Sequence, residues 1–99
     1  MVNFLEQVTT RIQAIESILC VGLDPAPEKV PAFLQSRPDP QWAWNQLIID
    51  VTHDLACCYK PNLAFYLARG EAGWRTLRAT IQYAEDHQVP VILDAKFGD

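Results

Sequence analysis

Several features are scarce or absent in this 99-residue sequence, and each absence narrows what the protein can be. Acidic residues outnumber basic ones by twelve to eight, which gives a formal net charge of −4. Because nucleic-acid binding begins with a basic surface, we expect no nucleic-acid partner. Internal repeats and low-complexity segments are also absent. A chain of this length has room for one modest core, so we expect one domain or part of one.

Long apolar runs are missing as well. The first twenty residues carry Glu6, Arg11 and Glu16 among the apolar ones, so no charge-free run resembles a signal peptide. No other stretch is long and apolar enough to span a membrane. We therefore expect a cytoplasmic protein with no membrane association.

Cysteines are few and show no metal-binding spacing. Cys20, Cys57 and Cys58 lie inside apolar runs, are odd in number and form no CxxC motif. We interpret them as buried free thiols, and we assign no metal ligand in this sequence.

Hydrophobic residues make up 49% of the chain, and their spacing alternates between helical and strand-like. Apolar residues at helical intervals after a capping box at Asn3 and Glu6 predict a helix over residues 4–16. The continuous apolar run 18–23 predicts a strand covered on both faces. Five prolines between residues 25 and 40 favour a loop with one helical turn.

The second half of the chain repeats this alternation. Asp39 followed by Pro40 predicts the start of a helix with a buried stripe, formed by Trp44, Leu47, Ile48, Val51 and Leu55. Further elements are expected as a strand over 56–60, a short helix over 63–68, a helix ending near His87 and a strand over 89–93. This order indicates parallel strands joined by crossover helices, hence an α/β fold, either a doubly wound sheet or a (β/α) barrel.

Polar residues follow the end of every predicted strand. They are Asp24 after the first, Lys60 and Asn62 at the second, and Asp94, Lys96 and Asp99 after the third. Both candidate folds place functional residues at the carboxyl ends of parallel strands, so we expect these side chains at one edge of the sheet.

The spacing Asp-x-Lys-x-x-Asp after the third strand is the strongest candidate site. On an extended strand Asp94 and Lys96 point to the same face with Cα atoms about 6.6 Å apart. Asp99 follows Gly98, where the chain can turn, so its carboxylate can approach the same lysine from this subunit or a neighbour. Ordinary surface charges are the competing interpretation of this short motif.

Three segments together resemble the orotidine 5'-phosphate decarboxylase family, and its longer bacterial branch in particular. The segments are Val21-Gly22-Leu23-Asp24-Pro25, then Lys60-Pro61-Asn62-Leu63-Ala64-Phe65-Tyr66 followed by Gly70 and Gly73, and finally Ile92-Leu93-Asp94-Ala95-Lys96-x-Gly98-Asp99. The resemblance covers essentially the whole chain. It implies that residues 1–99 are the N-terminal part of a single decarboxylase domain, with the first three strands of a (β/α)8 TIM barrel.

The resemblance also implies a reaction and a site. The reaction converts orotidine 5'-monophosphate to uridine 5'-monophosphate and carbon dioxide in pyrimidine biosynthesis, without a cofactor. Lys60, Asp94, Lys96 and Asp99 are implied to form the catalytic charge network, with Asp99 reaching the partner subunit's site in a homodimer. Asp24, assisted by Lys60, is implied to bind the ribosyl hydroxyls, and Asn62 to line the same pocket.

The implied chemistry suits these residue types. Loss of carbon dioxide from C6 of the pyrimidine leaves a carbanion with no good electron sink, so the site needs fixed positive charge and a proton donor there. The resemblance gives both tasks to Lys96 and places Asp94 beside the substrate carboxylate.

Two departures from the family pattern stand out. Phe97 occupies a position where relatives usually carry arginine. A (β/α)8 barrel needs about 250 residues and usually binds phosphate with loops after its last strands, so we expect the 99-residue chain alone to be inactive.

Two rival interpretations remain open. One is a magnesium-dependent sugar-phosphate decarboxylase or aldolase of the same superfamily, which resembles this motif at Asp94, Lys96 and Asp99 but carries an acidic metal ligand where this chain has Lys60. The other is a non-catalytic truncated remnant that keeps three strands and no complete pocket.

Overall fold

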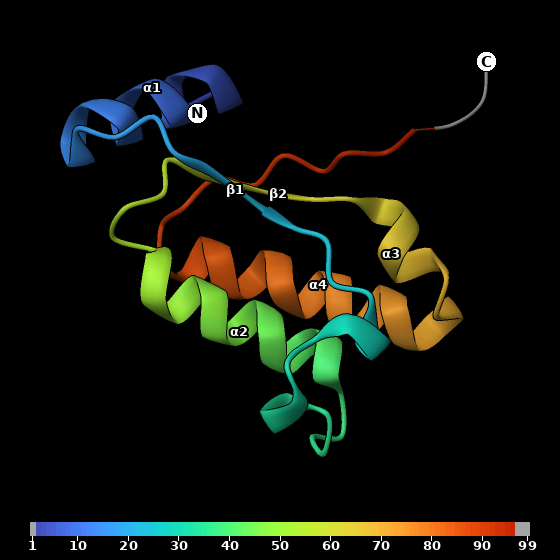
Figure 1. The fold of residues 1–99 in the computed structure, drawn as a ribbon. Coiled ribbons are helices and arrows are strands. Elements are labelled where there is room, and N and C mark those ends of the chain that lie inside the picture. Colours follow the sequence, from blue (N-terminus) through green and yellow to red (C-terminus); the bar gives the residue numbers. More distant parts are fainter. Residues whose placement is uncertain (1, 97–99) are drawn as a thin grey trace.

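The computed structural model describes residues 2–96 and arranges them as a small parallel sheet with helices packed against one face (Figure 1). Helices α2 (Pro40–Thr52) and α4 (Gly70–Asp86) lie side by side on that face. The strands above them are β1 (Cys20–Leu23) and β2 (Cys58–Pro61). Helix α1 (Phe4–Ile15) precedes β1, and the short α3 (Leu63–Leu67) follows β2.

Helices α1 and α2, which precede β1 and β2, begin where their capping residues predict. The side chain of Asn3 accepts a hydrogen bond of 2.8 Å from the backbone N–H of Glu6, which caps α1. Asp39 accepts one of 3.1 Å from the N–H of Trp42, and Pro40 occupies the first turn of α2. Both caps satisfy backbone donors that a helix start otherwise leaves without a partner.

The sheet is parallel, as expected, with β2 between β1 and the segment that follows α4. β1 pairs with β2 from Cys20 opposite Cys58 to Leu23 opposite Pro61. The predicted third strand lies beside β2 but forms two separate parallel bridges, from Tyr59 to residue 91 and from Asn62 to residue 94, rather than a regular strand. Backbone hydrogen bonds of 2.8–3.0 Å nevertheless tie this segment to β2.

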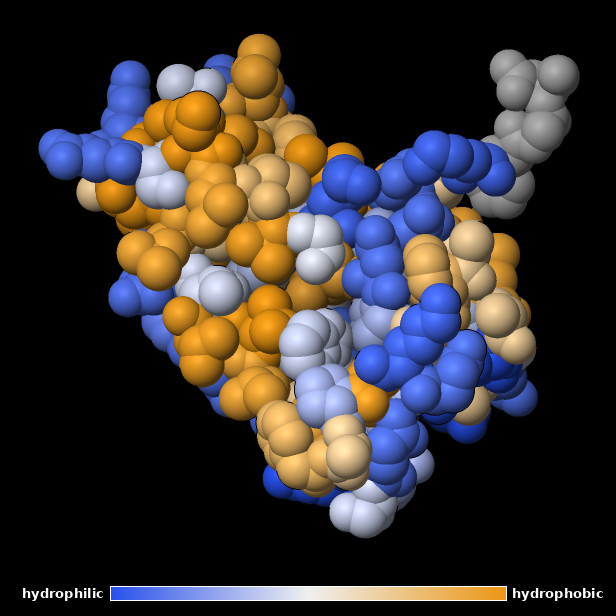
Figure 2. Space-filling model, in the orientation of Figure 1, coloured by the Kyte–Doolittle hydropathy of each residue, from blue (hydrophilic) through white to orange (hydrophobic). Residues whose placement is uncertain are grey.

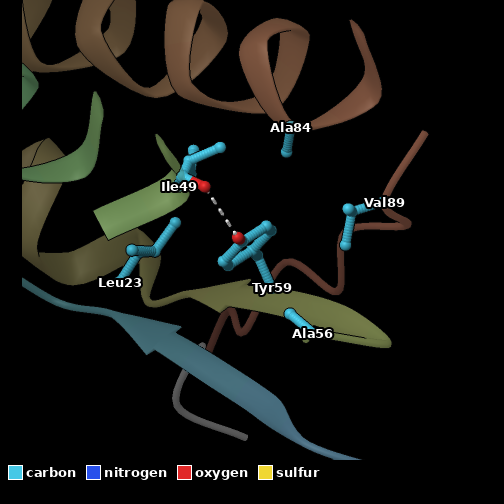
Figure 3. Close-up of a cluster of buried hydrophobic side chains, with 6 residues drawn as sticks. All are labelled: Leu23, Ile49, Ala56, Tyr59, Ala84 and Val89. Atoms are coloured by element: carbon cyan, nitrogen blue, oxygen red, sulfur yellow. Dashed lines mark hydrogen bonds between the residues drawn. The ribbon is translucent and has the colours of Figure 1, made fainter. Parts of the chain in front are cut away.

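The main core lies between β2 and the helices α2 and α4. Figure 3 shows its side chains around Tyr59, which is fully buried and points from β2 toward the helices. The cluster contains Leu23, Ile49, Ala56, Tyr59, Ala84 and Val89. Smaller clusters pack around Leu34 and around Tyr66, so hydrophobic burial holds the helical layer together along its length.

The other face of the sheet is open, which corrects the prediction that the first strand is covered on both sides. Ile18 is 81% exposed, Leu19 is 47% exposed, and of the residues of β1 only Leu23 is buried. Helix α1 buries none of its residues. Figure 2 shows hydrophobic residues gathered on the side of the molecule where α1 and β1 lie. Within residues 2–96, α2 and α4 pack on one face only, and on the other face Cys20 and Gly22 of β1 remain exposed.

Three smaller predictions were also wrong. Cys20 is exposed, so only two of the three thiols are buried as predicted. Val51 and Leu55, expected in the buried stripe of α2, are more than half exposed. The buried positions of α2 are instead Gln41, Asn45 and Ile49, on the face against which α4 packs, and Ala43, which packs against Val30 and Leu34 of the proline-rich loop.

The proline-rich loop contains two short 3₁₀ turns, Pro27–Lys29 and Ala32–Leu34, rather than one helical turn. In the part of the chain that the structure describes, every helix is too short or too polar to cross a membrane.

Candidate active site

Five of the predicted site residues lie where the parallel strands end. Asp24 directly follows β1, Lys60 is in β2 and Asn62 follows it. Asp94 and Lys96 come at the end of the segment that pairs with β2 on its other side. Parallel pairing brings these carboxyl ends to one edge of the sheet, as the sequence predicts.

Asp94 lies between two lysines. Its Oδ2 atom is 2.6 Å from Lys96 Nζ and 3.3 Å from Lys60 Nζ. The Asp94–Lys96 contact confirms that the two side chains share a face of the extended segment. The hydrogen bond from Lys96, supported by one from Lys60, lowers the pKa of the Asp94 carboxyl below its ordinary value. Asp94 is therefore ionised at neutral pH, and this three-residue cluster carries a net charge of +1.

Solvent exposure differs sharply across this cluster. The Asp94 side chain is 20% exposed, Lys60 is 41% exposed and Lys96 is 75% exposed. Water screens ion pairs that are this open, so their net stabilisation in the chain alone is small. Enclosure by further protein walls would strengthen both contacts by lowering the local dielectric.

Asp24 and Asn62 meet through the backbone. Asp24 Oδ1 accepts a hydrogen bond of 2.8 Å from the N–H of Asn62, which ties the end of β1 to the end of β2. The Asn62 side chain accepts one of 3.1 Å from the N–H of Ala64 and so caps α3. Within residues 2–96, Asp24 forms no ion pair with Lys60.

A hollow of about 380 Å³ opens beside Asp24. Aromatic and aliphatic side chains from the proline-rich loop, α2 and α3 form its walls. Its lining residues are Asp24, Pro25, Ala26, Lys29, Val30, Pro31, Trp44 and Phe65. An apolar hollow with a carboxylate at its edge is the usual form of a small-molecule site.

The arrangement offers two kinds of chemistry. The Asp94 cluster presents fixed positive charge and, in Lys96, an ammonium N–H that can donate a proton. The Asp24 carboxylate offers acceptor oxygens suited to hydroxyl groups. Among the described residues, no three His, Cys, Asp or Glu side chains are placed to hold a metal ion together.

Two residues named from the sequence, Asp99 and Phe97, lie outside the described residues. The predicted approach of Asp99 to Lys96, from this subunit or a neighbour, therefore stays a prediction.

Sequence reasoning missed a set of buried polar residues under the site. Gln41 and Asn45 of α2 and Thr76 and Thr80 of α4 are all buried: Asn45 donates to Thr80, and Arg69 donates to both Gln41 and Thr76. The sequence contains a pattern that could have indicated them, because Gln41 and Asn45, and likewise Thr76 and Thr80, have the i, i+4 spacing of residues on one helical face. The neighbouring apolar residues of α2 suggested a different stripe.

Known proteins resemble this chain in sequence and in fold. Residues 17–99 match the model of the orotidine 5'-phosphate decarboxylase / HUMPS family. An orotidine 5'-phosphate decarboxylase of Halorubrum lacusprofundi is 50% identical over 97 residues, which are 98% of this chain and 34% of the relative. One of Christiangramia forsetii is 46% identical over 96 residues, which are 95% of this chain and 35% of that protein.

Solved structures are similar in fold as well. The OMP decarboxylase of Leishmania donovani has a TM-score of 0.74 at 35% identity, over 97% of this chain and 34% of that one. The UMP synthase of the same organism has a TM-score of 0.78 at 34% identity, over all of this chain and 20% of that one. The chain thus spans about a third of the length of the curated relatives it matches, and it has an α/β fold with a partial parallel sheet rather than a full barrel. With 83 of its 99 residues matched by the family model, the chain belongs to the orotidine 5'-phosphate decarboxylase / HUMPS family.

Proposed function

We propose that this chain is the N-terminal third of an orotidine 5'-phosphate decarboxylase, which converts orotidine 5'-monophosphate to uridine 5'-monophosphate and carbon dioxide. The observation that carries the proposal is the placement of Lys60 and Lys96 on one carboxylate oxygen of Asp94. Residues 1–99 then form the first part of a single TIM-barrel domain, and the chain by itself lacks most of the pocket.

The proposed step needs no group beyond these side chains. The bond between C6 and the carboxylate carbon breaks, and its electron pair stays on C6 as carbon dioxide leaves. Lys96 stabilises this charge as it develops and transfers one ammonium proton to C6, which completes the product. Asp94, held by both lysines, fixes the position of Lys96 and lies beside the departing carboxylate.

The remaining roles follow the same division. Asp24 binds the ribosyl hydroxyls, assisted by Lys60, and Asn62 borders the same pocket through its contact with Asp24. Asp99 completes the charge network in the partner subunit of a homodimer. The reaction takes place in the cytoplasm, with a nucleotide as the small-molecule partner.

A metal-dependent reaction in the same superfamily is the closest rival. Lys60 argues against it, because an ammonium group 3.3 Å from Asp94 repels a cation at the place where the rival needs an acidic ligand. We expect the full-length protein to decarboxylate orotidine monophosphate at an unchanged rate in excess EDTA. A rate that falls with EDTA and returns with magnesium would contradict the proposal.

Lys96 provides the most direct test. Lys96→Ala in the full-length protein should reduce kcat by at least about 10²-fold, the range in which general acid catalysis contributes. Lys96→Arg separates the two tasks, because arginine keeps the positive charge but does not give up a proton at neutral pH. We expect Lys96→Arg to be as inactive as Lys96→Ala.

The matched control is Arg78→Ala, which removes an exposed cation from α4, away from the strand ends. It should leave kcat and the circular dichroism spectrum unchanged. Activity of Lys96→Ala within tenfold of the parent would remove Lys96 from the role of proton donor.

A further inference from the structure

The backbone on each side of Asp24 is held by a buried side chain. Tyr66 Oη donates a hydrogen bond of 2.7 Å to the carbonyl oxygen of Leu23, and Gln41 Nε2 donates one of 3.0 Å to that of Pro25. Tyr66 and Gln41 are both 0% exposed, whereas Asp24 is exposed. Asp24, the only exposed residue of the segment 23–25, therefore lies between two residues whose carbonyl groups are held by hydrogen bonds.

Hydrogen-bond direction makes the Tyr66 anchor specific. A carbonyl oxygen can only accept, so the single hydroxyl proton of Tyr66 is committed to Leu23. Tyr66 Oη must then accept from Asn45 Nδ2, which lies 2.9 Å away and also donates to Thr80. The hydroxyl proton of Tyr66 and both amide protons of Asn45 thus each have one assigned acceptor, which favours one position of the tyrosine ring.

Gln41 is fixed in a similar way. Its Nε2 also donates to the carbonyl oxygen of Phe65, at 3.1 Å, and its Oε1 accepts from Arg69. Arg69 is in turn paired with Asp39, the N-cap of α2, at 3.3 Å. These bonds join α2 and α3 to the loop that follows β1, so a shift of either helix is transmitted to the backbone at Asp24.

The third attachment is on the carboxylate itself. Asp24 Oδ1 accepts from the N–H of Asn62 at 2.8 Å. With the backbone fixed on both sides and one oxygen held, the side chain has little freedom beside the hollow that it borders. Preorganisation of this kind lowers the entropic cost of forming a bond to a ligand.

We propose that Tyr66 and Gln41 are positioning residues, which act through Asp24 to set how strongly the site recognises the ribosyl hydroxyls of its nucleotide. The inference rests on the proposed function, because it takes the role of Asp24 from there. Neither residue touches the ligand. Their effect is on hydroxyl recognition rather than on the charge cluster around Asp94.

The test compares two ligands in the full-length protein. The dissociation constants of uridine 5'-monophosphate and its 2',3'-dideoxy analogue are measured by calorimetry, and their ratio isolates hydroxyl recognition. Asp24→Ala should lower this ratio by at least about tenfold, as expected for loss of hydrogen bonds to a charged group. Tyr66→Phe, which removes one oxygen and keeps the ring, should lower it by about threefold or more.

The matched control is Tyr59→Phe. Tyr59 is also fully buried, and its hydroxyl contacts Thr52 at 2.7 Å and the carbonyl of Ile49, away from Asp24. It should lower stability about as much as Tyr66→Phe while changing the ratio less than about twofold. Gln41→Met should behave like Tyr66→Phe.

A double-mutant cycle decides whether the effect passes through Asp24. In the Asp24→Ala background, Tyr66→Phe should cause no further change in the ratio. If Tyr66→Phe alters the ratio no more than Tyr59→Phe while Asp24→Ala lowers it, the positioning role is wrong and the proposed function stands. If Asp24→Ala leaves the ratio unchanged, the ribosyl role of Asp24 and the inference built on it both fail.

Discussion

The two faces of the sheet differ in how completely this chain buries them. On one face α2 and α4 cover the strands, and Tyr59, Leu23 and Ile49 are fully buried there. On the other face Cys20 and Gly22, which alternate with the core-facing Val21 and Leu23, remain exposed, and no residue of α1 is fully buried (Figure 2). The sequence is apolar on both faces, so the difference lies in the packing partners and not in composition.

The two main parts of the candidate site differ in the same way, one being supported by buried hydrogen bonds and the other being open to solvent. The helical face contains the buried polar network that holds the backbone around Asp24. The lysines of the charge cluster lie at the edge of the sheet and remain 41% and 75% exposed. The hydrogen bonds that hold the backbone beside Asp24 are thus buried within these residues, while the lysines of the charge cluster are open to solvent.

The largest expected effect concerns the 99-residue chain by itself. It should self-associate and form no detectable uridine monophosphate, because an uncovered apolar face and an exposed edge invite other chains. Size-exclusion chromatography and a product assay measure both properties. A well-packed monomer that turns over orotidine monophosphate would contradict the incomplete fold.

Which face causes the association can be tested with a pair of variants. Ile18→Asp on the open face should reduce association strongly. Trp74→Asp, which replaces a residue 46% exposed on α4, should reduce it little. Equal effects would show that the two faces do not differ as proposed.

An intermediate effect is expected within the closed helical layer. A Cβ atom at Gly73 would lie 1.7 Å from the carbonyl oxygen of Tyr66, so Gly73→Ala must displace α4 from α3. We expect it to lower the free energy of unfolding of the full-length protein by about 3 kcal/mol, at the upper end for overpacking. Urea denaturation measures the change.

Gly70→Ala is the matched control. Gly70 has φ of +63° and no atom within 4 Å of the added Cβ, so the cost is conformational only. It should be about 1 kcal/mol. A larger loss at Gly70 than at Gly73 would show that backbone strain outweighs the close approach of the helices.

The smallest effect is expected for the ion pairs of Asp94 with Lys60 and Lys96. The pKa of Asp94 is lowered, so the contribution of its lysine contacts is present above the ordinary value of 3.8 and is lost as the pH falls through the depressed pKa. Lys96→Met should raise this pKa more than Lys60→Met, because the Lys96 hydrogen bond is the larger influence. Carboxyl NMR titration of the full-length protein measures both shifts.

Arg78→Met provides the control for this titration, since it removes a cation from α4 and should leave the Asp94 midpoint in place. A larger rise with Lys60→Met than with Lys96→Met would reverse the assigned order of the two contacts.

Local patterns in the sequence were sufficient for the order of elements and the position of the charged residues. Asn3 and Asp39 cap their helices because capping depends on atoms three residues away. Asp94 and Lys96 meet because extended backbone places alternate residues on one face. Parallel order then places the strand ends together, and three motifs in sequence indicate the family.

Only the tertiary structure decided which apolar and polar residues are buried. Gln41, Asn45 and Thr80 are buried because α4 packs against that face of α2, whereas Val51 and Leu55 face away. The register of β2 against its neighbour and the anchoring of Leu23 by Tyr66 likewise depend on residues 38 to 43 positions apart. Burial is a property of packing partners, and no local pattern specifies which partner a face will meet.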